Sequence, residues 1–537
     1  MLDVGCATGA LGFAYKQRNP ACRVLGIERD PEAARLAAQR LDRVAIADVE
    51  QSMLPFGGDE VDCIVYGDVL EHLRDPWAVL AAHARVLSRD GTIVICMPNA
   101  DHWSFAARLL RGDWDYEDQG LFDRTHLRWF TYDSTRAALR GAGLRPTDVA
   151  PRIFDGAAAE EFTRAMWPAL TALGVDPAEF LHRAKPLQYV WRARHVETPV
   201  MQVTSTMLVP VGGVSDVRVL EPMKALASEP GFLTRVVGEY RSDPQPPSTP
   251  TIFILHRPLL AGDEGLAVVR ALIADGYVVV CEFDDHPGGI PVLQRPDIQN
   301  FRAVHAVQTT TEPLAAVLRQ DNPEVKVFAN AASAIPQARN FADPNRMTMF
   351  FGGLNREQDW PPYVTALNAV AGFMGDRLHF RIINDRGLFD ALATPHKSFT
   401  PLCGYATYRD LLSYSEISFM PLADTPFNRC KSDLKFIEAS AHRVASLATP
   451  VVYGGSVEDG RTGFLFNDSS TLQQRLGRMV AQPELTREMA EAARDHIARE
   501  RMLAYQISAR AAWYWSLWGR REELTRALYA RVPELAV

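Results

Sequence analysis

The sequence lacks the features that would place the protein in a membrane, on a nucleic acid or outside the cell. No stretch of 18 consecutive apolar residues occurs, so we expect no membrane-spanning helix. A net charge of −8 and an isoelectric point near 5.9 argue against nucleic-acid binding. Because Met1 leads directly into an apolar strand pattern, we also expect no signal peptide. These absences together predict a cytoplasmic protein.

Cysteine is scarce and irregularly placed. The chain has seven cysteines, and none of them is spaced as C-x-x-C. Cys6, Cys63, Cys96 and Cys281 lie in or beside apolar segments, which is typical of buried, reduced thiols in a cytosolic protein. We therefore expect no structural zinc, and no other metal site.

The first 100 residues alternate between strand and helix patterns. With 537 residues, the chain is long enough for two to four domains. The helices are expected near 9–18, 31–41 and 76–88, and the strands at 1–5, 24–28, 44–47, 61–66 and 92–97. This alternation predicts an α/β domain with a parallel sheet covered by helices on both faces.

The string MLDVGCATGALG at residues 1–12 is the strongest local motif. An apolar strand runs into a glycine-bearing turn and then a helix, so the backbone can approach a ligand closely. Glu28 follows Gly9 by 19 residues and ends a second apolar strand, where a nucleoside cofactor needs a carboxylate for its ribose. Ala7 breaks the dinucleotide pattern G-x-G-x-x-G, which favours a cofactor without phosphates. An NAD-dependent oxidoreductase remains a rival.

Five motifs follow one another in a familiar order. They are LDVGCATG, GIERD at 26–30, AIADVE at 45–50, DCIVYGDVLEHLRDP at 62–76 and GTIVICMPN at 91–99. In this order they resemble the Rossmann-like S-adenosylmethionine-dependent methyltransferases. The segment GLFDRTHLRWFTYDSTRAALRGAGL at 120–144 resembles the closing part of a small-molecule branch of that family. The resemblance covers about residues 1–150.

The resemblance implies a set of cofactor-binding residues. Asp3, Gly5 and Gly9 would lie near the methionine part of S-adenosylmethionine, and Glu28 would bind the ribose hydroxyls. Family members also carry a helix and a loop before the glycine-bearing strand, which this sequence does not contain. We therefore expect an amino-terminally truncated domain, and either a longer natural chain or weak cofactor binding.

Further polar residues are candidates for the reaction itself. By resemblance, Asp48 would face the adenine amino group, although it can equally start a turn, and Asp68 would lie beside the reacting centre. His72, His102 and His126 are candidate general bases for methylation of a hydroxyl. His126 is the first choice, and its alternative role is to orient the last strands through hydrogen bonds.

The rest of the chain contains two more α/β runs. Residues 150–200 have mostly helical patterns, with no strand expected before about 200. Strands then begin near 201, 233, 251, 277, 303 and 325, and a new unit begins with MTMFFGG at 347–353. Two consecutive Rossmann-like units joined near residue 340 are the layout of GT-B glycosyltransferases, which bind the donor in the cleft between the units.

Several motifs in these units strengthen that resemblance. CEFDDHP at 281–287, AVQTTTEPLAAVL at 306–318 and VFANAAS at 327–333 are similar to the acceptor half of bacterial glycan-assembly glycosyltransferases. NRCKSDLKFIEASAHRVASLATPVV at 428–452 and VEDGRTGFLFND at 457–468 resemble their donor half. The resemblance suggests transfer with retention of configuration.

The donor half implies a nucleotide-sugar site. Glu438 would bind the donor ribose, but Cys430 stands where the family usually has a second glutamate, eight residues earlier. Lys431 and Arg356 can neutralise the donor diphosphate, and the backbone amides near Gly213 can approach the same phosphates. The alternative for Lys431 and Glu438 is a solvated, salt-linked helix face.

The acceptor half has an acidic cluster at the end of a strand. Asp284, Asp285 and His286 could contact an acceptor hydroxyl, and their alternative role is to cap a loop or helix.

An aromatic stripe near the carboxyl end is more often core than a membrane anchor. This stripe consists of Trp513, Tyr514, Trp515 and Trp518.

The sequence thus predicts a fusion of three Rossmann-like units. The expected parts are a methyltransferase domain at 1–150, a helical connector at 151–200, GT-B domains at 201–340 and 341–500, and a helix at 501–537 that crosses back. The predicted function is glycosyl transfer and O-methylation in surface polysaccharide or lipid-linked glycan synthesis. If the protein associates peripherally with a membrane, we expect it at the inner face. The alternative is that one half is a degenerate scaffold. The oligomeric state is not predicted.

Overall fold

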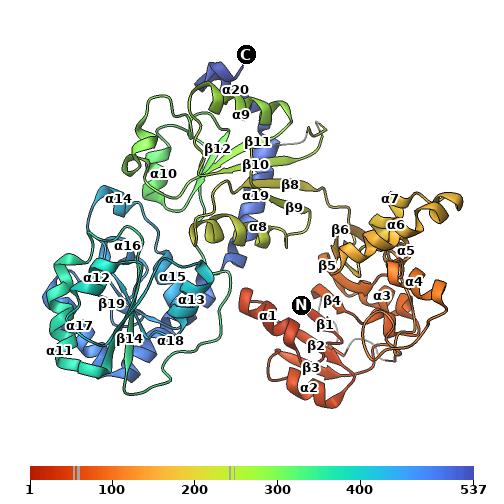
Figure 1. The fold of residues 1–537 in the computed structure, drawn as a ribbon, viewed down its shortest axis with the longest axis horizontal. Coiled ribbons are helices and arrows are strands. Elements are labelled where there is room, and N and C mark those ends of the chain that lie inside the picture. Colours follow the sequence, from red (N-terminus) through yellow and green to blue (C-terminus); the bar gives the residue numbers. More distant parts are fainter. Residues whose placement is uncertain (52–54, 57–60, 241–243, 247, 537) are drawn as a thin grey trace. The chain divides into compact units, whose positions relative to one another are not determined.

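The computed structural model describes residues 1–51, 55–56, 61–240, 244–246 and 248–536. The chain forms two compact units. The first comprises residues 1–16 and 21–199, and the second comprises residues 17–20 and 200–537. Figure 1 shows the helices and strands of both units. Three separate sheets provide the framework, one in the first unit and two in the second.

The first unit contains a seven-stranded sheet in the order β3-β2-β1-β4-β5-β7-β6. Its strands are β1 (Leu2–Val4), β2 (Leu25–Glu28), β3 (Arg43–Ile46), β4 (Val61–Gly67), β5 (Leu87–Pro98), β6 (Arg145–Arg152) and β7 (Gln188–Arg194). The first five are parallel, as the sequence predicts. Buried aliphatic residues of β1, β2, β4 and β5 form one continuous core.

Helices follow the strands in the first unit. They are α1 (Ala10–Arg18), α2 (Pro31–Ala37), α3 (Pro76–Ala84), α4 (Trp103–Arg111), α5 (Tyr132–Gly141), α6 (Gly156–Ala172) and α7 (Pro177–Ala184), with the 3-10 turn η1 (Leu70–His72). Asp30 caps α2 by accepting a hydrogen bond from the Ala33 amide at 2.7 Å, with Pro31 in the first turn. Asp75 and Pro76 start α3 in the same way.

The expectation of no strand between residues 150 and 200 is wrong. Strand β7 lies between β5 and β6 and is antiparallel to both. Its side chains alternate, with Tyr189, Trp191 and Ala193 buried and their neighbours partly exposed. This two-residue period was present in the sequence, and the tryptophan is one of the largest fully buried side chains. Residues 188–194 are therefore part of the first sheet and not of a helical connector.

The second unit begins with a six-stranded parallel lobe, in the order β13-β12-β11-β10-β8-β9. Its strands are β8 (Met201–Thr206), β9 (Phe232–Val237), β10 (Thr251–His256), β11 (Val278–Glu282), β12 (Ala306–Thr309) and β13 (Val325–Val327). Its helices are α8 (Glu221–Leu226), α9 (Gly262–Ala274) and α10 (Glu312–Leu318), and a π-helical turn, η2 (Asp216–Leu220), precedes α8.

A second six-stranded parallel lobe follows, in the order β16-β15-β14-β17-β18-β19. Its strands are β14 (Met347–Gly352), β15 (Leu378–Ile383), β16 (Lys397–Thr400), β17 (Ile417–Met420), β18 (Ala445–Ala448) and β19 (Gly463–Leu465). Its helices are α11 (Val364–Met374), α12 (Arg386–Ala391), α13 (Tyr405–Ser413), α14 (Pro426–Arg429), α15 (Leu434–Ala441), α16 (Pro450–Tyr453), α17 (Ser469–Ala481) and α18 (Pro483–Glu500). The prediction of three Rossmann-like units is confirmed.

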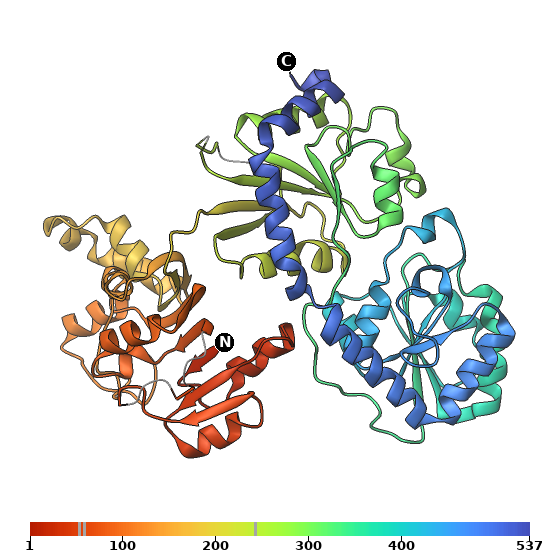
Figure 2. The same cartoon turned by 180° about the vertical axis from the view of Figure 1, so that it is seen from behind.

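The last helices return from the second lobe to the first. After α18, the chain continues as α19 (Ile507–Gly519) and α20 (Arg521–Arg531), which lie along the first lobe in both views (Figures 1 and 2). The aromatic stripe on α19 is packed into this lobe's core: Trp513 and Tyr514 are buried, and Trp515 and Trp518 pack against the cluster. In the described part of the chain, no helix is both long and apolar enough to cross a bilayer.

Candidate functional sites

The glycine turn after β1 is tightly enclosed. Gly5 and Gly9 adopt positive φ angles of 67° and 76°, and Ala7 between them has φ 47°. A Cβ atom on Gly5 would lie 2.6 Å from Cγ2 of Val69, and one on Gly9 would lie 3.1 Å from Cα of Ala37. Both the backbone conformation and the close packing therefore require glycine at these two positions.

Glu28 is fixed at the carboxyl end of β2, beside this turn. Its Oε2 accepts a hydrogen bond from the Ala7 amide and its Oε1 accepts one from the Asp30 amide, both at 2.8 Å. The two bonds hold the carboxylate between two loops. Each oxygen keeps a lone pair that can accept a bond from a ligand hydroxyl.

Asp3 lies beneath the turn and is almost completely buried. Burial raises the pKa of Asp3 to about 6, the Gly12 amide opposes the shift, and the negative charge of Glu28 adds to it. Its Oδ2 is buried without a hydrogen-bond partner. An ammonium group of a ligand would supply both the missing donor and the missing positive charge.

Asp68 and Asp48 occupy two further loops at this edge of the sheet. Asp68 directly follows β4, has φ 56°, and its Oδ1 accepts a hydrogen bond from Nε2 of Gln188 on β7 at 2.7 Å. Asp48 accepts a bond from the Glu50 amide at 3.0 Å, which is the turn role that the sequence left open. Their predicted contacts with the methyl donor stay predictions.

His72 and His126, the predicted bases, are neighbours in the structure. Their ring centroids are 4.8 Å apart in an edge-to-face arrangement. Burial and the nearby His72 lower the pKa of His126. His102, the third candidate, is not in this cluster, and its Nδ1 bonds with the Ser104 hydroxyl at 2.8 Å.

Glu71 completes this cluster, although the sequence analysis did not select it. Its side chain is 1% exposed, and both carboxylate oxygens are buried without a hydrogen-bond partner. Burial raises its pKa to about 8, with Asp68 and Asp123 adding to the shift. Its position next to His72 in a turn after a strand was the available signal.

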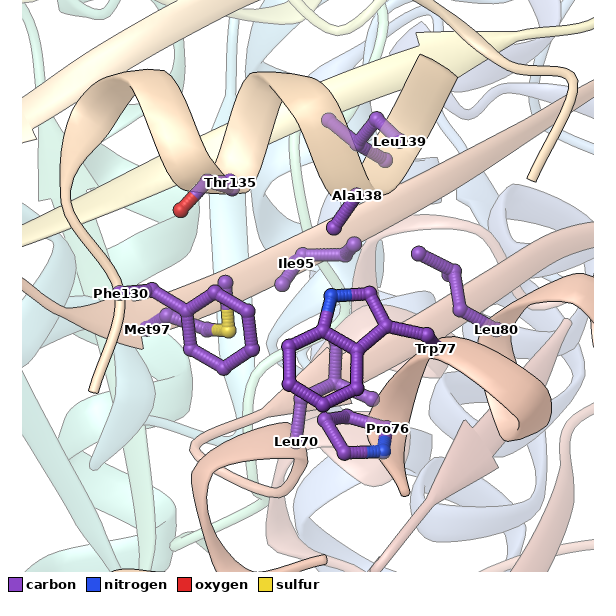
Figure 3. Close-up of a pocket in the computed structure, with 10 residues that line it drawn as sticks. All are labelled: Leu70, Pro76, Trp77, Leu80, Ile95, Met97, Phe130, Thr135, Ala138 and Leu139. Atoms are coloured by element: carbon purple, nitrogen blue, oxygen red, sulfur yellow. The ribbon is translucent and has the colours of Figure 1, made fainter. Parts of the chain in front are cut away.

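A small pocket nearby is part of the core. It has a volume of about 10 Å³ and lies between α3, α5 and β5, where Figure 3 shows apolar side chains facing one another. Its lining residues are Leu70, Pro76, Trp77, Leu80, Ile95, Met97, Phe130, Thr135, Ala138 and Leu139. It has room for about one water and offers few polar partners, so it does not bind a substrate.

The second unit has a much larger cavity of about 300 Å³ between its two lobes. This volume is enough for a nucleotide-sized ligand. Its polar lining comes from both lobes and comprises Arg218, Asp284, Asp285, Asn330, Asn355, Arg356, Asn384, Tyr405, Tyr408, Lys431, Ser432, Lys435, Glu438 and Tyr453. The cavity therefore brings together the predicted residues Gly213, Asp285, Arg356, Lys431 and Glu438.

Three cationic side chains from the second lobe face this cavity. Arg356 pairs with Asp359 at 3.2 Å, and Nζ of Lys431 lies 3.7 Å from Oδ1 of Asp285. Lys435 was not predicted, and its Nζ donates a hydrogen bond to the Gly352 carbonyl. Burial lowers the pKa of Lys431 and lowers that of Lys435 to about 8.

Glu438 lies one helical turn after Lys435 on α15 and is almost completely buried. It accepts hydrogen bonds from the hydroxyls of Tyr405 at 2.7 Å and Tyr408 at 3.1 Å. The two tyrosines, on α13, were not predicted because they lie about 30 residues earlier in the chain. The buried position is inconsistent with the alternative of a solvated helix face.

The acidic cluster after β11 is held by one arginine. Arg257 donates to Oδ1 of Asp284 at 2.7 Å and to Oδ2 of Asp285 at 3.0 Å. Burial raises the pKa of Asp284. His286 accepts a bond from the Gly288 amide at 2.9 Å and caps a short turn, which is its predicted alternative role.

Two further predicted positions have other partners. The Gly213 amide donates to Oδ2 of Asp216 at 3.0 Å, with φ 81° at Gly213. Cys430 is buried against the core of the first lobe, and its carbonyl accepts a bond from the Thr311 hydroxyl at 2.9 Å. The cavity lining does not include Cys430, so Glu438 has no carboxylate partner from that position.

Comparison with known proteins finds a methyltransferase match in residues 2–95 of the first unit. Residues 2–95 match the family model described as "Methyltransferase domain". Over 154 residues the chain is 32% identical to malonyl-[acyl-carrier protein] O-methyltransferase of Geobacter sulfurreducens. This alignment covers 28% of this chain and 57% of that protein. A ubiquinone biosynthesis O-methyltransferase of Cereibacter sphaeroides is 25% identical over 161 residues, or 29% of this chain and 64% of its own length.

A solved structure resembles the chain over a longer stretch. Anabaena Alr3699/HepE, in complex with UDP and glucose, covers 59% of this chain and 99% of its own, with a TM-score of 0.42 and 13% identity. The chain spans about three fifths of the length of the curated relatives it matches. Residues 2–95 are thus a domain of the methyltransferase family, in a chain that continues into two further Rossmann-like lobes.

Proposed function

We propose that the protein is a bifunctional, glycan-modifying enzyme. The first unit methylates a hydroxyl and the second transfers a sugar from a nucleotide-sugar to a hydroxyl, on the same class of saccharide acceptor. The tethering of two sites in one chain raises the effective concentration of the product of one reaction at the other site. The predicted domain boundaries and the role in surface polysaccharide or lipid-linked glycan synthesis belong to this proposal.

The observation that carries the methyltransferase half is the placement of carboxylates around the glycine turn. Asp3 offers an unpartnered buried oxygen to an ammonium group, and Glu28 offers a fixed carboxylate to a ribose diol. Both lie at the carboxyl ends of parallel strands, where α/β sheets bind ligands. The family match of residues 2–95 supports the same assignment.

The chemistry that bound S-adenosylmethionine supplies is an electrophilic methyl group. In the transfer, the acceptor oxygen forms a bond to carbon while the sulfur–methyl bond breaks, and its electron pair stays on sulfur. The acceptor proton must leave, and Asp68, His72 and His126 are the candidates to receive or direct it, since Asp68 directly follows β4 and the two histidine rings are in contact.

The observation that carries the glycosyltransferase half is the combination of cations with Glu438 in one cavity. When the sugar is transferred, the nucleoside diphosphate leaves with the bonding electron pair. Arg356, Lys431 and Lys435 face the same space and can balance that charge. Glu438, oriented by two tyrosines, can accept bonds from the ribose hydroxyls, and Asp285 lies on the opposite lobe for the acceptor.

The test is to incubate the full chain with radiolabelled S-adenosylmethionine, and separately with labelled nucleotide-sugars, over a panel of saccharide acceptors. We expect transfer in both assays, with Glu28→Ala losing only methylation and Glu438→Ala losing only sugar transfer. No transfer in either assay over a broad panel would overturn the proposal. Transfer in one assay alone would favour the alternative that one half is a scaffold.

A further inference from the structure

Next to the proposed methyl-donor site, the first unit contains a compact set of metal-type ligands. The set includes the two candidate bases, His72 and His126, which in this role hold an ion and do not take the proton. One ligand atom each from Glu71, His72 and His126 lies within 4.8 Å of the other two. Two of the three side chains are buried and the third is partly buried. A carboxylate and two imidazoles at this separation are a ligand set of catalytic metal sites that leave open positions.

The bonding of the two histidines leaves the same nitrogen available on each ring. The Thr125 hydroxyl donates to Oδ1 of Asp123 at 2.6 Å, so toward Nδ1 of His72, 2.9 Å away, it can only accept. Nδ1 of His126 faces the Leu121 carbonyl at 3.3 Å and must also carry the proton. In the neutral form of each ring the proton is thus on Nδ1 and the lone pair is on Nε2, the arrangement that orients histidine ligands in metal sites.

Glu71 supplies the independent observation that a ligand is missing. The residue is 1% exposed, and both carboxylate oxygens are buried without a hydrogen-bond partner. A buried polar group without a partner is costly, whereas a cation bound to it satisfies both oxygens. The neighbouring acidic residues Asp68 and Asp123 add negative charge to the same region.

The cluster is also held rigidly and lies against the glycine turn. The amides of Leu127 and Arg128 donate to the Glu71 carbonyl at 2.8 and 3.0 Å, which ties the loop that carries His126 to η1. Val69, at the start of η1, is the residue that a Cβ atom on Gly5 would strike. The ligand atoms are therefore preorganised next to the proposed methyl-donor site.

We propose that Glu71, His72 and His126 form a binding site for a divalent first-row transition-metal ion, which holds the acceptor hydroxyl for methylation. This inference rests on the proposed methyl transfer. The ion keeps open positions for the acceptor, lowers the pKa of the hydroxyl that binds to it, and so lets the proton leave to water before the carbon–oxygen bond forms. The preferred acceptor has two adjacent hydroxyls, because a diol can occupy two open positions.

The test measures binding of manganese(II) alone to the tag-free, chelator-treated full chain. Manganese is used because the seven thiols of the chain bind it weakly. We expect one equivalent to bind, followed by the electron paramagnetic resonance signal of the free ion and by calorimetry. In Glu71→Gln and His126→Gln the dissociation constant should rise by about 100-fold or more. His102→Gln, which removes an equally buried histidine of the same unit, should bind as the wild type does.

Two outcomes would overturn the inference. One is the absence of a saturable equivalent, and the other is binding that Glu71→Gln and His126→Gln leave unchanged. Glu71→Gln is nearly isosteric and keeps the buried side chain uncharged, so a folded variant is expected, and its circular dichroism spectrum checks this. S-adenosylmethionine binding is measured separately by thermal shift in chelator. Methyl transfer that survives chelator and Glu71→Gln refutes the metal site alone, whereas metal binding without transfer to any acceptor refutes the proposed methylation alone.

Discussion

Asp3 and Glu71 in the first unit carry buried carboxylate oxygens without a hydrogen-bond partner, whereas Glu438 in the second unit is held by two tyrosine hydroxyls. Burial raises the pKa of Asp3 to about 6 and that of Glu71 to about 8. In the cavity of the second unit, it is a lysine, Lys435, whose pKa burial lowers to about 8. In both units the pKa shift disfavours the charged form of the side chain, because neighbouring groups do not fully compensate its charge.

The sign of the missing compensation indicates the sign of the ligand. A cationic ligand would relieve the carboxylates of the first unit, and an anionic ligand would relieve the lysine of the second. Asp284 also has a raised pKa, but Arg257 holds it at 2.7 Å, so it is already compensated from within the chain. The comparison therefore matches a sulfonium and ammonium ligand to the first unit and a diphosphate to the second.

The largest expected effect comes from removing the lysine that marks the anionic site. Lys435→Ala should weaken nucleotide-sugar binding by at least about 30-fold, because a buried charge partner contributes roughly 2–5 kcal/mol. Calorimetry with UDP and with a panel of nucleotide-sugars measures the change. Lys397→Ala is the matched control, since that ammonium group donates to the carbonyls of Phe389 and Leu392, outside the cavity. Equal losses in the two variants would contradict the assignment.

The affinity of the wild type for nucleotide-sugars should also fall as the pH rises above about 8, because Lys435 in the ligand-free protein then loses its proton. Lys435→Ala should not show this decline. A decline of equal size in both proteins would mean that another group titrates.

Asp3→Asn tests the cationic site through stability. The folded pKa of Asp3, about 6, lies above its ordinary value of 3.8, so the wild type loses stability as the pH rises through this window. The loss, at most about 3 kcal/mol, is complete above pH 6. The variant should therefore melt at a higher temperature than the wild type at pH 7 but not at pH 4, in the absence of ligand.

With S-adenosylmethionine present, the same variant should lose most of the ligand-induced thermal shift. Asp75→Asn is the control, because Asp75 is an exposed helix cap in the same unit and asparagine caps equally well. If Asp3→Asn melts no higher than the wild type at pH 7, the carboxylate is not the uncompensated charge that the comparison requires.

Glu28→Ala tests whether the two units act independently. Two hydrogen bonds to a ribose should be lost, so affinity for S-adenosylmethionine should fall by roughly ten- to a hundredfold. Nucleotide-sugar binding should not change, because the two sites belong to different units and share no lining residue. Glu32→Ala, an exposed carboxylate on α2, is the control. Loss of sugar transfer in a folded Glu28→Ala protein would mean that the two halves form one coupled active site.

The sheets could be predicted from sequence better than the sites. Buried parallel strands read as short apolar runs between helices, so the framework of all three units was accessible. Strand β7 was missed because its alternating pattern follows two helices and pairs with β5, about 95 residues earlier. An antiparallel insertion of this kind is decided by long-range packing, which local periodicity does not report.

The missed site residues have the same cause. Glu71 and Lys435 each lie beside predicted residues, but only the folded chain shows that the Glu71 oxygens lack partners or that the Lys435 ammonium group faces the cavity. Tyr405 and Tyr408 meet Glu438 because α13 and α15 come together in space. The chemistry of such residues depends on side chains that other loops and helices bring close in space. The spacing of residues along the chain does not show which side chains these are.

The smallest effect, and the finest probe of the comparison, is expected from Tyr405→Phe. This change removes one of two hydroxyls that orient Glu438 and leaves the Tyr408 bond in place, so nucleotide-sugar affinity should fall by about 1 kcal/mol, or roughly fivefold. Tyr414→Phe, at the end of the same helix, is the control because its exposed hydroxyl lies outside the cavity. The double variant Tyr405→Phe/Tyr408→Phe should lose more than the sum of the single changes, since Glu438 would then be a buried carboxylate without a partner, as Asp3 and Glu71 are in the first unit. Calorimetry at pH 7 measures the wild type, the three single variants Tyr405→Phe, Tyr408→Phe and Tyr414→Phe, and the double variant. Strictly additive losses would mean that the two tyrosines act independently, and that Glu438 without them is not the costly unpartnered carboxylate that the comparison requires.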